Sequence, residues 1–308
     1  MTTHTEYEVA VIGAGPAGLT AALYLARYHR KVVVIHDGNS RALRIPLTHN
    51  APGFPDGVNG IDLVDRMTEH AREFGAKFVE ERVETVRKQD KGFVIQVQNG
   101  GQWHVRGVVL ATGILLNEVD LPRPIHEQAI KDDVLRYCAI CDGYEHTAKR
   151  IGVIGCDSNG AGEALFLSRY SSDITLMPLS FSELEPNEIE ALDREGITVK
   201  HGALDRIIPY SDRIEVKLSD QDALEFDVIY PALGCSPRAE LAAALGIELT
   251  ESGCVPDRFV TGPDIAGFYA AGDVVDGLDQ ISVAMGHGAL AATRLHNWLR
   301  AQDGEALP

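Results

Sequence analysis

Two stretches of the chain share one order of hydrophobic and polar positions. A shift of 142 residues places residues 9–37 on residues 151–179 without a gap. Each stretch starts with an apolar run, passes through a turn that contains glycine, continues with apolar residues at helical spacing, and ends in a second apolar run. Each stretch is therefore predicted to form a βαβ unit.

The separation of the two units predicts how the domains are organised. Solenoid repeats recur about every 20–50 residues, whereas these units begin 142 residues apart. We therefore expect an α/β fold with two Rossmann-like domains, each a doubly wound sheet in a three-layer arrangement. The chain length of 308 residues agrees with two domains of roughly 100–200 residues each.

Net charge and hydropathy argue against several classes of protein. The formal net charge is −17 and the isoelectric point is about 5.0, which is unlike a nucleic-acid-binding protein. Residues 9–26 carry no charged side chain, but the glycines and proline near their start favour a strand, a turn and a helix over a membrane span. Because residues 1–8 contain no Lys or Arg, no signal peptide is expected. We predict a cytoplasmic protein whose partners include neither a membrane nor a nucleic acid.

The turn of the first unit has the sequence Gly13-Ala14-Gly15-Pro16-Ala17-Gly18. It follows a predicted strand and opens a predicted helix, which is the context that a dinucleotide-binding fingerprint requires. Gly13 permits the turn, Gly15 lets the backbone approach a pyrophosphate at the helix N-terminus, and Gly18 lets the helix pack closely on the strand. The first unit is therefore predicted to bind a dinucleotide.

An acidic residue should follow such a turn by about 20 residues and bind ribose hydroxyls. The sequence offers His36 and then Asp37 at the end of the second apolar run. Asp37 is the predicted ribose ligand, with His36 beside it.

The turn of the second unit, Gly155-Cys156-Asp157-Ser158-Asn159-Gly160, departs from this pattern. It keeps the outer glycines but places Asp157 where the backbone should meet the pyrophosphate. At about 4 Å and an effective dielectric constant near 20, two unit charges repel by about 4 kcal/mol, which is roughly three decades in affinity. The next apolar run ends in Met177-Pro178-Leu179-Ser180, with neither an acid for a ribose hydroxyl nor an arginine for a 2′-phosphate. The second unit therefore lacks the features by which such a unit binds a nicotinamide nucleotide.

The five cysteines are too few for a secreted disulfide scaffold. Cys138 and Cys141 form a Cys-x-x-Cys pair, which in a reducing compartment is either half of a metal site or a redox dithiol. No second Cys-x-x-Cys or His-x-x-x-His follows it, so a zinc ion would lack two ligands. The redox dithiol is the favoured interpretation, and no metal is expected.

Together, five segments resemble the low-molecular-weight, thioredoxin-reductase-like family of FAD-dependent disulfide oxidoreductases. These segments are Gly13–Gly18, Asn50–Pro55, Ala111–Gly113, Cys138–Gly143 and Ala270–Val274. The resemblance covers nearly the whole chain and implies a discontinuous FAD-binding domain at residues 1–116 and 242–308. An NAD(P)H-binding-like domain at residues 117–241 is then inserted into the first and carries the two cysteines. The resemblance also implies a homodimer.

The resemblance further implies roles for individual residues. Cys141 would face the flavin, Cys138 would exchange disulfides with a substrate, and Asp142 would carry protons to and from the thiols. The residues expected to bind FAD are Gly13, Gly15, Pro16, Ala17, Gly18, His36, Asp37, Arg41, Asn50, Thr112, Gly113, Gly272, Asp273, Gln280 and Ile281. Gln280 and Ile281 would start a helix whose positive dipole end stabilises the reduced flavin.

The leading hypothesis is an FAD-dependent enzyme that exchanges electrons between its flavin, the Cys138–Cys141 pair and an external thiol or disulfide, without the usual use of NADPH. Its substrate would be a thioredoxin-like protein or a small dithiol or disulfide. The first alternative is an ordinary NADPH-dependent thioredoxin reductase, and the second is a dithiol oxidase with oxygen as the final acceptor. A flavin-binding protein without catalysis is a further alternative, against which the intact Cys-x-x-Cys-Asp sequence argues.

Overall fold

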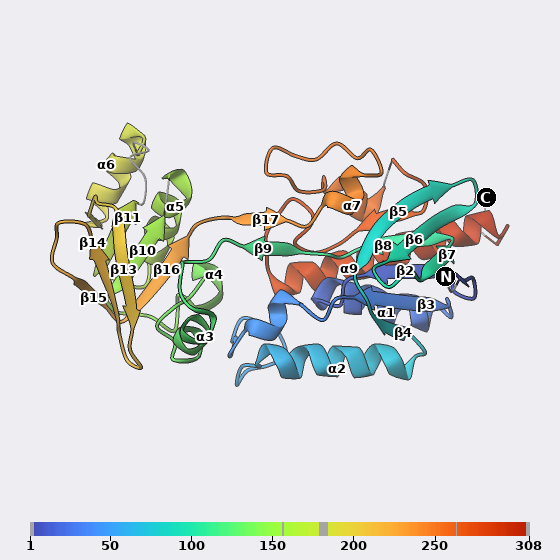
Figure 1. Cartoon of the computed structure of the whole chain (residues 1–308), viewed down its shortest axis with the longest axis horizontal. Helices are drawn as coiled ribbons and strands as arrows, with labels where there is room; N and C mark the ends of the chain where they lie inside the picture. Colours follow the sequence, from blue (N-terminus) through green and yellow to red (C-terminus); the bar gives the residue numbers. More distant parts are fainter. Residues whose placement is uncertain (1–2, 156, 179–183, 263, 306–308) are drawn as a thin grey trace. The chain divides into compact units, whose positions relative to one another are not determined.

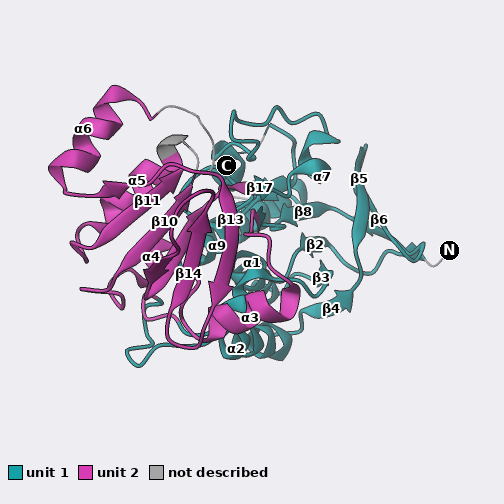
Figure 2. Cartoon of the chain, turned by 60° about the vertical axis from the view of Figure 1, so that its left-hand side comes forward, with its two compact units in different colours: residues 1–47, 51–115, 236–308 teal, residues 48–50, 116–235 magenta. Residues whose placement is uncertain are grey.

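The chain divides into two compact units (Figure 2). Unit 1 comprises residues 1–47, 51–115 and 236–308, and unit 2 comprises residues 48–50 and 116–235. The structure, a computed structural model, describes residues 3–155, 157–178, 184–262 and 264–305, with only the backbone described at residues 157 and 158. Parallel sheets flanked by other layers occur in both units, which confirms the predicted α/β fold class with two Rossmann-like domains.

The centre of unit 1 is a parallel sheet of five strands in the order β18-β8-β2-β3-β4 (Figure 1). These strands are β2 (Val9–Ile12), β3 (Val32–His36), β4 (Lys77–Glu80), β8 (Gly107–Leu110) and β18 (Phe268–Ala270). Every residue of β2 is buried, and its side chains alternate between two cores. Val9 and Val11 lie in one core, and Ala10 and Ile12 lie in the other. The sheet is therefore covered on both faces, as its continuous apolar strands predict.

Different layers cover the two faces of this sheet. One core contains residues of the helices α1 (Pro16–Arg27) and α9 (Ile281–Gln302). The other contains residues of an antiparallel sheet formed by β5 (Val83–Gln89), β6 (Gly92–Val97) and β7 (Gln102–Val105), with β1 (Thr3–His4) beside β7. Unit 1 also contains η1 (Arg41–Arg44), α2 (Gly60–Glu73), α7 (Glu240–Ala243) and α8 (Arg258–Thr261).

Unit 2 repeats the plan on a smaller scale. Its parallel sheet has the order β12-β11-β10-β16, formed by β10 (Ile151–Gly155), β11 (Ile174–Pro178), β12 (Thr198–Val199) and β16 (Val228–Ala232). One core joins this sheet to α4 (Ala139–Asp142), α5 (Asp157–Leu167) and α6 (Pro186–Arg194). The other joins it to α3 (Arg123–Lys131) and to the antiparallel sheet of β13 (Leu204–Pro209), β14 (Ile214–Leu218) and β15 (Leu224–Phe226).

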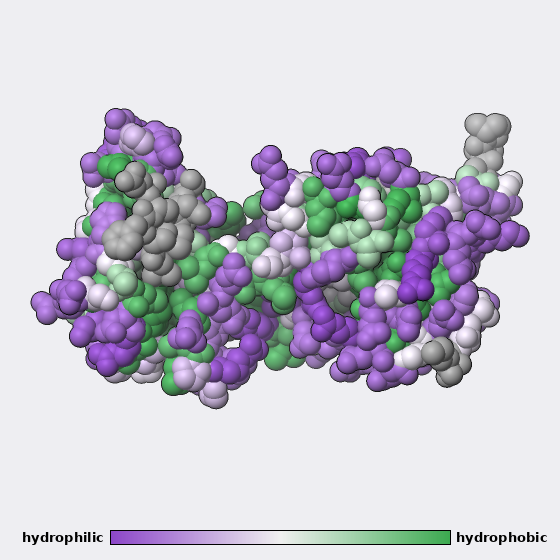
Figure 3. Space-filling model, turned by 45° about the horizontal axis from the view of Figure 1, so that its top comes forward, coloured by the Kyte–Doolittle hydropathy of each residue, from purple (hydrophilic) through white to green (hydrophobic). Residues whose placement is uncertain are grey.

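The chain passes between the units along two paired strands, β9 (Ile114–Leu116) and β17 (Cys235–Pro237). Hydrophilic and hydrophobic residues are mixed on the surface that Figure 3 shows. Within the described ranges, no helix combines the length and the apolar character that crossing a membrane would require.

Candidate active site

The turn after β2 has the backbone geometry that its glycines predict. Gly13 has a φ of +110°, and a Cβ there would lie 2.2 Å from the Ala111 carbonyl oxygen. A Cβ on Gly18 would lie 2.0 Å from the Gly13 carbonyl oxygen. Both glycines are therefore required by the packing of strand, turn and helix.

Gly15 differs from these two glycines because its surroundings are open. The nearest heavy atom to a Cβ there would be the Ser40 Oγ, at 3.3 Å. Gly15 is also the N-cap of α1, Pro16 begins the helix, and the first turn contains neither a side-chain cap nor an acidic residue. The first backbone amides of α1 are thus left for an anionic ligand, which is the chemistry that a pyrophosphate needs.

The start of α1 is surrounded by other residues that were predicted to bind FAD. A Cβ on Gly272 would lie 2.7 Å from the Ala17 Cβ, so the segment after β18 touches α1. The next residue, Asp273, lies 3.2 Å from the Arg41 guanidinium, measured between Oδ2 and Nη1. Burial raises the pKa of Asp273 above its ordinary value, against the opposing effect of Arg41.

Helix α9 begins beside this group of residues. Gln280 is its N-cap and Ile281 its first residue, and the first turn carries no acidic side chain. Asp279, just before the helix, lies 3.8 Å from the Arg41 guanidinium. Burial and the negative charge of Asp273 raise the pKa of Asp279 to about 6. The two predicted residues of α9 thus lie at an uncapped, positively polarised helix end.

Arg238, which the sequence analysis did not single out, connects three predicted residues. Its Nη2 donates to the Asp37 Oδ2 at 2.6 Å, its backbone amide donates to the Gly113 carbonyl, and its own carbonyl accepts from the Thr112 hydroxyl at 2.7 Å. Burial alone would raise the pKa of Asp37, but the bonds from Arg238 and from the Asn39 amide lower it overall. The Asp37 carboxylate is therefore ionised and already holds a cation.

Two predicted residues have other surroundings. His36, the last residue of β3, accepts a hydrogen bond at Nδ1 from the Gly38 amide, at 3.2 Å. Asn50 belongs to unit 2, where its side chain lies 3.5 Å from the Ile140 carbonyl and accepts a hydrogen bond from the Thr48 hydroxyl. Asn50 is therefore placed with the helix of the cysteine pair.

Cys138 and Cys141 form a disulfide, with their Cα atoms 5.3 Å apart. Cys138 is the N-cap of α4, and its carbonyl accepts a hydrogen bond from the Cys141 amide at 3.0 Å. The two exposed side chains nearest in sequence are Ile140 and Tyr144, the latter 77% exposed. The two cysteines themselves are partly exposed, so the disulfide lies near the surface of unit 2, in a helix of one turn.

Asp142 follows the disulfide and has a mostly buried carboxyl group. The Tyr230 hydroxyl donates to its Oδ1 at 2.8 Å, and the Arg136 Nε lies 3.4 Å from its Oδ2. Burial raises the pKa of Asp142, and this effect exceeds the lowering by Arg136 and Tyr230. Because its pKa is raised, this carboxyl group keeps a proton to higher pH than an ordinary aspartate does, which suits a proton carrier that directly follows Cys141 in the chain.

A second carboxyl group, which the sequence analysis missed, lies under the same helix. The Glu163 Oε1 of α5 accepts a hydrogen bond from the Ala139 amide at 3.3 Å. Burial raises its pKa, and the nearby Asp142 adds to the effect. The internal repeat could have drawn attention to this residue, because Glu163 aligns with Ala21 of α1, which is fully buried. Acidic residues are rarely buried unless they are paired, so an acidic residue at the position of a buried alanine predicts a polar partner nearby.

The turn of unit 2 keeps the packing part of the fingerprint. A Cβ on Gly155 would lie 2.7 Å from the Gly160 Cα, so these glycines join β10 to α5. Unlike Gly13, Gly155 does not have a left-handed φ. Helix α5 begins at Asp157. Cys156, the side chain of Asp157, and the strand-end residues Leu179 and Ser180 lie outside the described residues.

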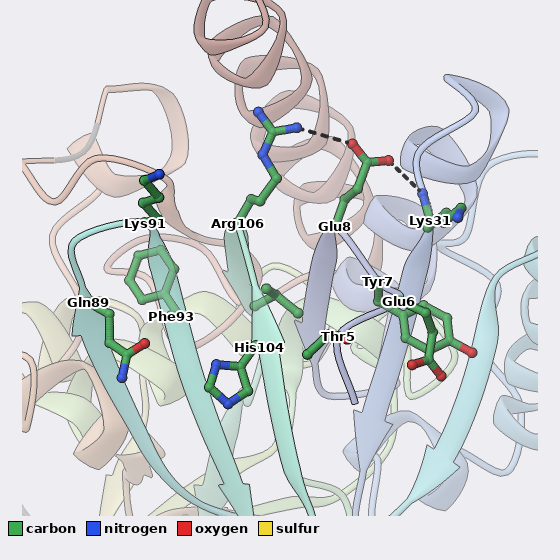
Figure 4. A pocket seen from close by; sticks show the side chains of 11 residues that line it. Thr5, Glu6, Tyr7, Glu8, Lys31, Gln89, Lys91, Phe93, His104 and Arg106 are labelled. Carbon is green, nitrogen blue, oxygen red and sulfur yellow. Dashed lines mark hydrogen bonds and ion pairs between the residues drawn. The ribbon is translucent and has the colours of Figure 1, made fainter. Parts of the chain in front are cut away.

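A pocket of about 330 Å³ lies in unit 1 around the segment before β2 (Figure 4). Figure 4 shows Glu8 bonded to the Arg106 side chain and to the Lys31 backbone amide in this pocket. None of the lining residues is a cysteine or was predicted to bind FAD. The pocket is therefore separate from the candidate site.

Comparison with known proteins gives consistent matches over almost the whole chain. Residues 7–288 match the family described as pyridine nucleotide-disulphide oxidoreductase. The thioredoxin reductase of Mycolicibacterium smegmatis is 31% identical over 317 residues, which cover 98% of this chain and 99% of that protein. Among solved structures, HlmI has a TM-score of 0.87 at 28% identity and covers 97% of this chain and 94% of its own. Thioredoxin reductase from Streptococcus pyogenes MGAS5005 has a TM-score of 0.86 at 23% identity, covers 96% of this chain and 98% of its own, and shows the shared fold.

Proposed function

Because the chain belongs to the pyridine nucleotide-disulphide oxidoreductase family, we propose that it exchanges electrons between FAD, the Cys138–Cys141 pair and an external thiol or disulfide. It is an oxidoreductase with the thioredoxin-reductase-like fold. The finer part of the proposal is that NADPH is not its ordinary electron donor. The observation that supports this proposal about NADPH is the presence of Asp157 at the position that Gly15 has in the first unit.

The proposed FAD site is the group of residues around the start of α1. The open surroundings of Gly15 and the uncapped amides of α1 suit the pyrophosphate. Asp37 would bind ribose hydroxyls while paired with Arg238, and the start of α9 at Gln280 would lie against the flavin ring. When bound, FAD supplies or accepts the electron pair that resets the cysteines. The remaining proposed ligands in unit 1 are Gly13, Pro16, Ala17, Gly18, His36, Arg41, Thr112, Gly113, Gly272, Asp273 and Ile281. Asn50 belongs to unit 2 and stays a prediction from the sequence.

The cysteines perform the exchange with the substrate. In the direction of disulfide reduction, the Cys138 thiolate attacks one substrate sulfur and releases the other as a thiolate. The Cys141 thiolate then attacks the Cys138 Sγ, which re-forms the intramolecular disulfide and releases the second substrate thiolate. Asp142 would take and return the protons at Cys141, because it directly follows that residue in the chain and its carboxyl group has a raised pKa.

The charge of the second unit supports the part of the proposal that concerns NADPH. Asp157 would bring a carboxylate to the position of the pyrophosphate, with a repulsion of about 4 kcal/mol if both remain charged. From residue 170 to residue 193 the sequence contains six acidic residues and no Lys or Arg. This stretch includes β11 and the residues that follow it, where a 2′-phosphate would need a cation.

An ordinary NADPH-dependent thioredoxin reductase is the second candidate. The specific observation in its favour is the 31% identity to the thioredoxin reductase of Mycolicibacterium smegmatis. That relative makes thioredoxin the first protein substrate to test, beside small dithiols. We also propose a homodimer, which light scattering of the purified protein would test.

Anaerobic reduction of the flavin separates these functions. Dithiothreitol should bleach the flavin of the purified protein, while NADPH and NADH should leave it oxidised. Rapid bleaching by NADPH would instead establish the second candidate. If dithiothreitol bleaches the flavin and oxygen then restores it with multiple turnovers, the enzyme is a dithiol oxidase.

Three variants sharpen the experiment. Asp157→Gly should gain bleaching by NADPH if the carboxylate is the obstacle. Cys141→Ser should lose bleaching by dithiothreitol, because the flavin-facing thiol is absent. Cys235→Ser, which removes an exposed cysteine of β17 that is not part of the disulfide, serves as the matched control and should behave as the wild-type protein.

A further inference from the structure

We propose that Tyr230 and His146 form a proton relay that connects the Asp142 carboxyl group with solvent beside Asp133. This inference rests on the proposed function, in which Asp142 exchanges protons with the dithiol. It assigns a positioning and proton-carrying role to two residues that have no place in the motifs of the sequence.

The inner half of the relay is buried and continuous. The Tyr230 hydroxyl lies 2.8 Å from the Asp142 Oδ1 and 2.7 Å from the His146 Nδ1. Tyr230 is fully buried and His146 is 4% exposed. The same Nδ1 lies 3.0 Å from the Asp142 carbonyl oxygen. Because a carbonyl only accepts hydrogen bonds, Nδ1 carries the hydrogen in neutral His146, and the Tyr230 hydroxyl is free to donate to the carboxylate.

The outer half of the relay reaches the surface. The His146 Nε2 lies 3.3 Å from the Asp133 Oδ2, and the Asp133 side chain is 51% exposed. With Nδ1 protonated, Nε2 presents its lone pair, and it has no hydrogen-bond partner among the described residues. Arg136 bonds to Asp133 and lies 3.4 Å from Asp142, so it holds both ends of the relay. The imidazole can therefore receive a proton at Nε2 from a water molecule beside Asp133.

Delivery of one proton to Asp142 requires three bonds to form and two internal bonds to break. His146 gains a proton at Nε2, and its Nδ1–H bond breaks as the Tyr230 oxygen takes that proton. The Tyr230 O–H bond breaks in turn, and the Asp142 Oδ1 becomes protonated. No electrons are transferred, and the reverse sequence releases a proton to solvent. Burial lowers the pKa of His146, so the ring is neutral before and after the delivery. The delivery leaves the hydrogen on Nε2, and the reverse sequence, which follows when the dithiol gives its proton back to Asp142, returns it to Nδ1.

The charged groups around the relay influence the pKa values of His146 and Tyr230. Those that act on Tyr230 or His146 are Asp142, Glu145, Arg136 and Asp133 from the segment of residues 133–146, and Glu163 from α5. The carboxylates favour a proton on His146, whereas burial and Arg136 oppose it. On balance the pKa of His146 is lowered, so these surroundings favour the neutral ring.

Comparison of the two repeated units indicates that packing does not require a polar side chain at the position of Tyr230. Tyr230 pairs with Val153 in the sheet of unit 2, and Val109 pairs with Val11 in the sheet of unit 1. Val11 and Val153 are equivalent in the repeat, so Tyr230 occupies the position of Val109, which is also fully buried. An apolar residue fills this core position in unit 1. The hydroxyl of Tyr230 is thus an addition specific to the unit that carries the dithiol.

The test compares two phenylalanine variants of the whole FAD-loaded protein. Tyr230→Phe removes the central hydroxyl of the relay and keeps the ring. Tyr137→Phe is the matched control, because it removes a hydrogen bond of the same 2.7 Å length between a tyrosine and the buried His126. The rate of flavin bleaching by dithiothreitol is measured from acid to alkaline pH in H₂O and in D₂O.

We expect Tyr230→Phe to slow bleaching by at least about tenfold, a part of what positioned proton transfer contributes. Its pH profile and its D₂O effect should both change, whereas Tyr137→Phe should keep those of the wild-type protein. His146→Asn, which retains a donor near Nδ1 but has no second nitrogen facing Asp133, should be equally slow. Imidazole added to His146→Gly should restore part of the rate.

Two results would overturn the relay. One is a Tyr230→Phe protein with the wild-type rate, pH profile and D₂O effect. The other is an equal loss at every pH with an unchanged D₂O effect, because that is the signature of a structural role. If dithiothreitol fails to bleach the wild-type flavin, the proposed function fails instead. The same comparison is then made on reduction of the Cys138–Cys141 disulfide itself, followed by alkylation of the released thiols, and the same two results decide it.

Discussion

Replacing Gly15 with alanine tests the proposed FAD site at its most specific point. In the protein alone the new Cβ meets only the Ser40 Oγ, at 3.3 Å, and this end of a flexible side chain can move. Gly15 is an N-cap, where alanine is less favourable than glycine by about 1 kcal/mol or less. The variant should therefore fold, with a small loss of stability that urea unfolding measures.

The effect on FAD should be much larger than the effect on folding. A methyl group at residue 15 occupies the side from which a pyrophosphate approaches the first amides of α1. Loss of one hydrogen bond to a charged group costs about 1.5–3 kcal/mol, which corresponds to a Kd for FAD raised by about 10- to 150-fold. The assay is titration of the apoprotein with FAD, followed by the fluorescence of the flavin.

The control for this prediction is Gly162→Ala. Gly162 is an exposed glycine within α5, and a Cβ there would meet nothing within 4 Å. The control should bind FAD as the wild-type protein does and gain a little helix stability. If Gly15→Ala binds FAD as tightly as Gly162→Ala, no phosphate approaches residue 15, and the assignment of the site is refuted.

Three further predictions follow from buried groups. Gly18→Ala should lose about 3 kcal/mol or more of unfolding free energy, because its Cβ would overlap a backbone oxygen at 2.0 Å. Gly160→Ala, whose nearest contact would be at 3.2 Å, should lose clearly less, and urea unfolding compares the two variants. Asp279 has a pKa of about 6, which is above the pKa of an aspartate in the unfolded chain. Between these two pKa values the folded protein keeps a proton that the unfolded chain has lost. The free energy of unfolding therefore falls as the pH rises towards 6. Asp279→Asn should therefore be more stable than the wild-type apoprotein at alkaline pH and no more stable well below the unfolded pKa, as unfolding at both pH values would show. Glu163→Gln should keep the hydrogen bond from the α4 amide, while Glu163→Leu should lose about 1–3 kcal/mol of stability by leaving it unsatisfied, again measured in urea.

The fold and the turn of unit 1 were predictable because they depend on local patterns. Continuous apolar runs and helical spacing repeat 142 residues apart, and the structure has β2, α1 and β3 at the first copy and β10, α5 and β11 at the second. The packing roles of Gly13 and Gly18 were predictable for the same reason, because the strand, the turn and the helix that they join are neighbours in the sequence.

The surroundings of the dithiol were not predictable in the same way. Tyr230 lies in the run Val-Ile-Tyr-Pro-Ala, which predicts a buried strand and nothing about the hydroxyl. It reaches Asp142 from 88 residues along the chain, and Arg238 reaches Asp37 from 201 residues away. Such pairs form only when distant segments pack together, so no spacing of residues within one segment predicts them.

The two units show how one duplicated plan can serve two kinds of chemistry. In unit 1, α1 packs closely on α9, and a Cβ on Gly288 would lie 2.2 Å from the Ala17 carbonyl oxygen. In unit 2, the position equivalent to the buried Ala21 is Glu163, which bonds to the helix of the cysteine pair. A core position of the neighbouring strand likewise carries Tyr230 in place of valine.

Both polar replacements occur in the unit whose turn has lost the glycine for phosphate approach, while the glycines that join strand to helix remain. A buried carboxyl and a buried hydroxyl are costly unless they are hydrogen-bonded, and here each bonds to the segment of the disulfide or its adjacent acid. The outer glycines of unit 2 are thus explained by packing alone.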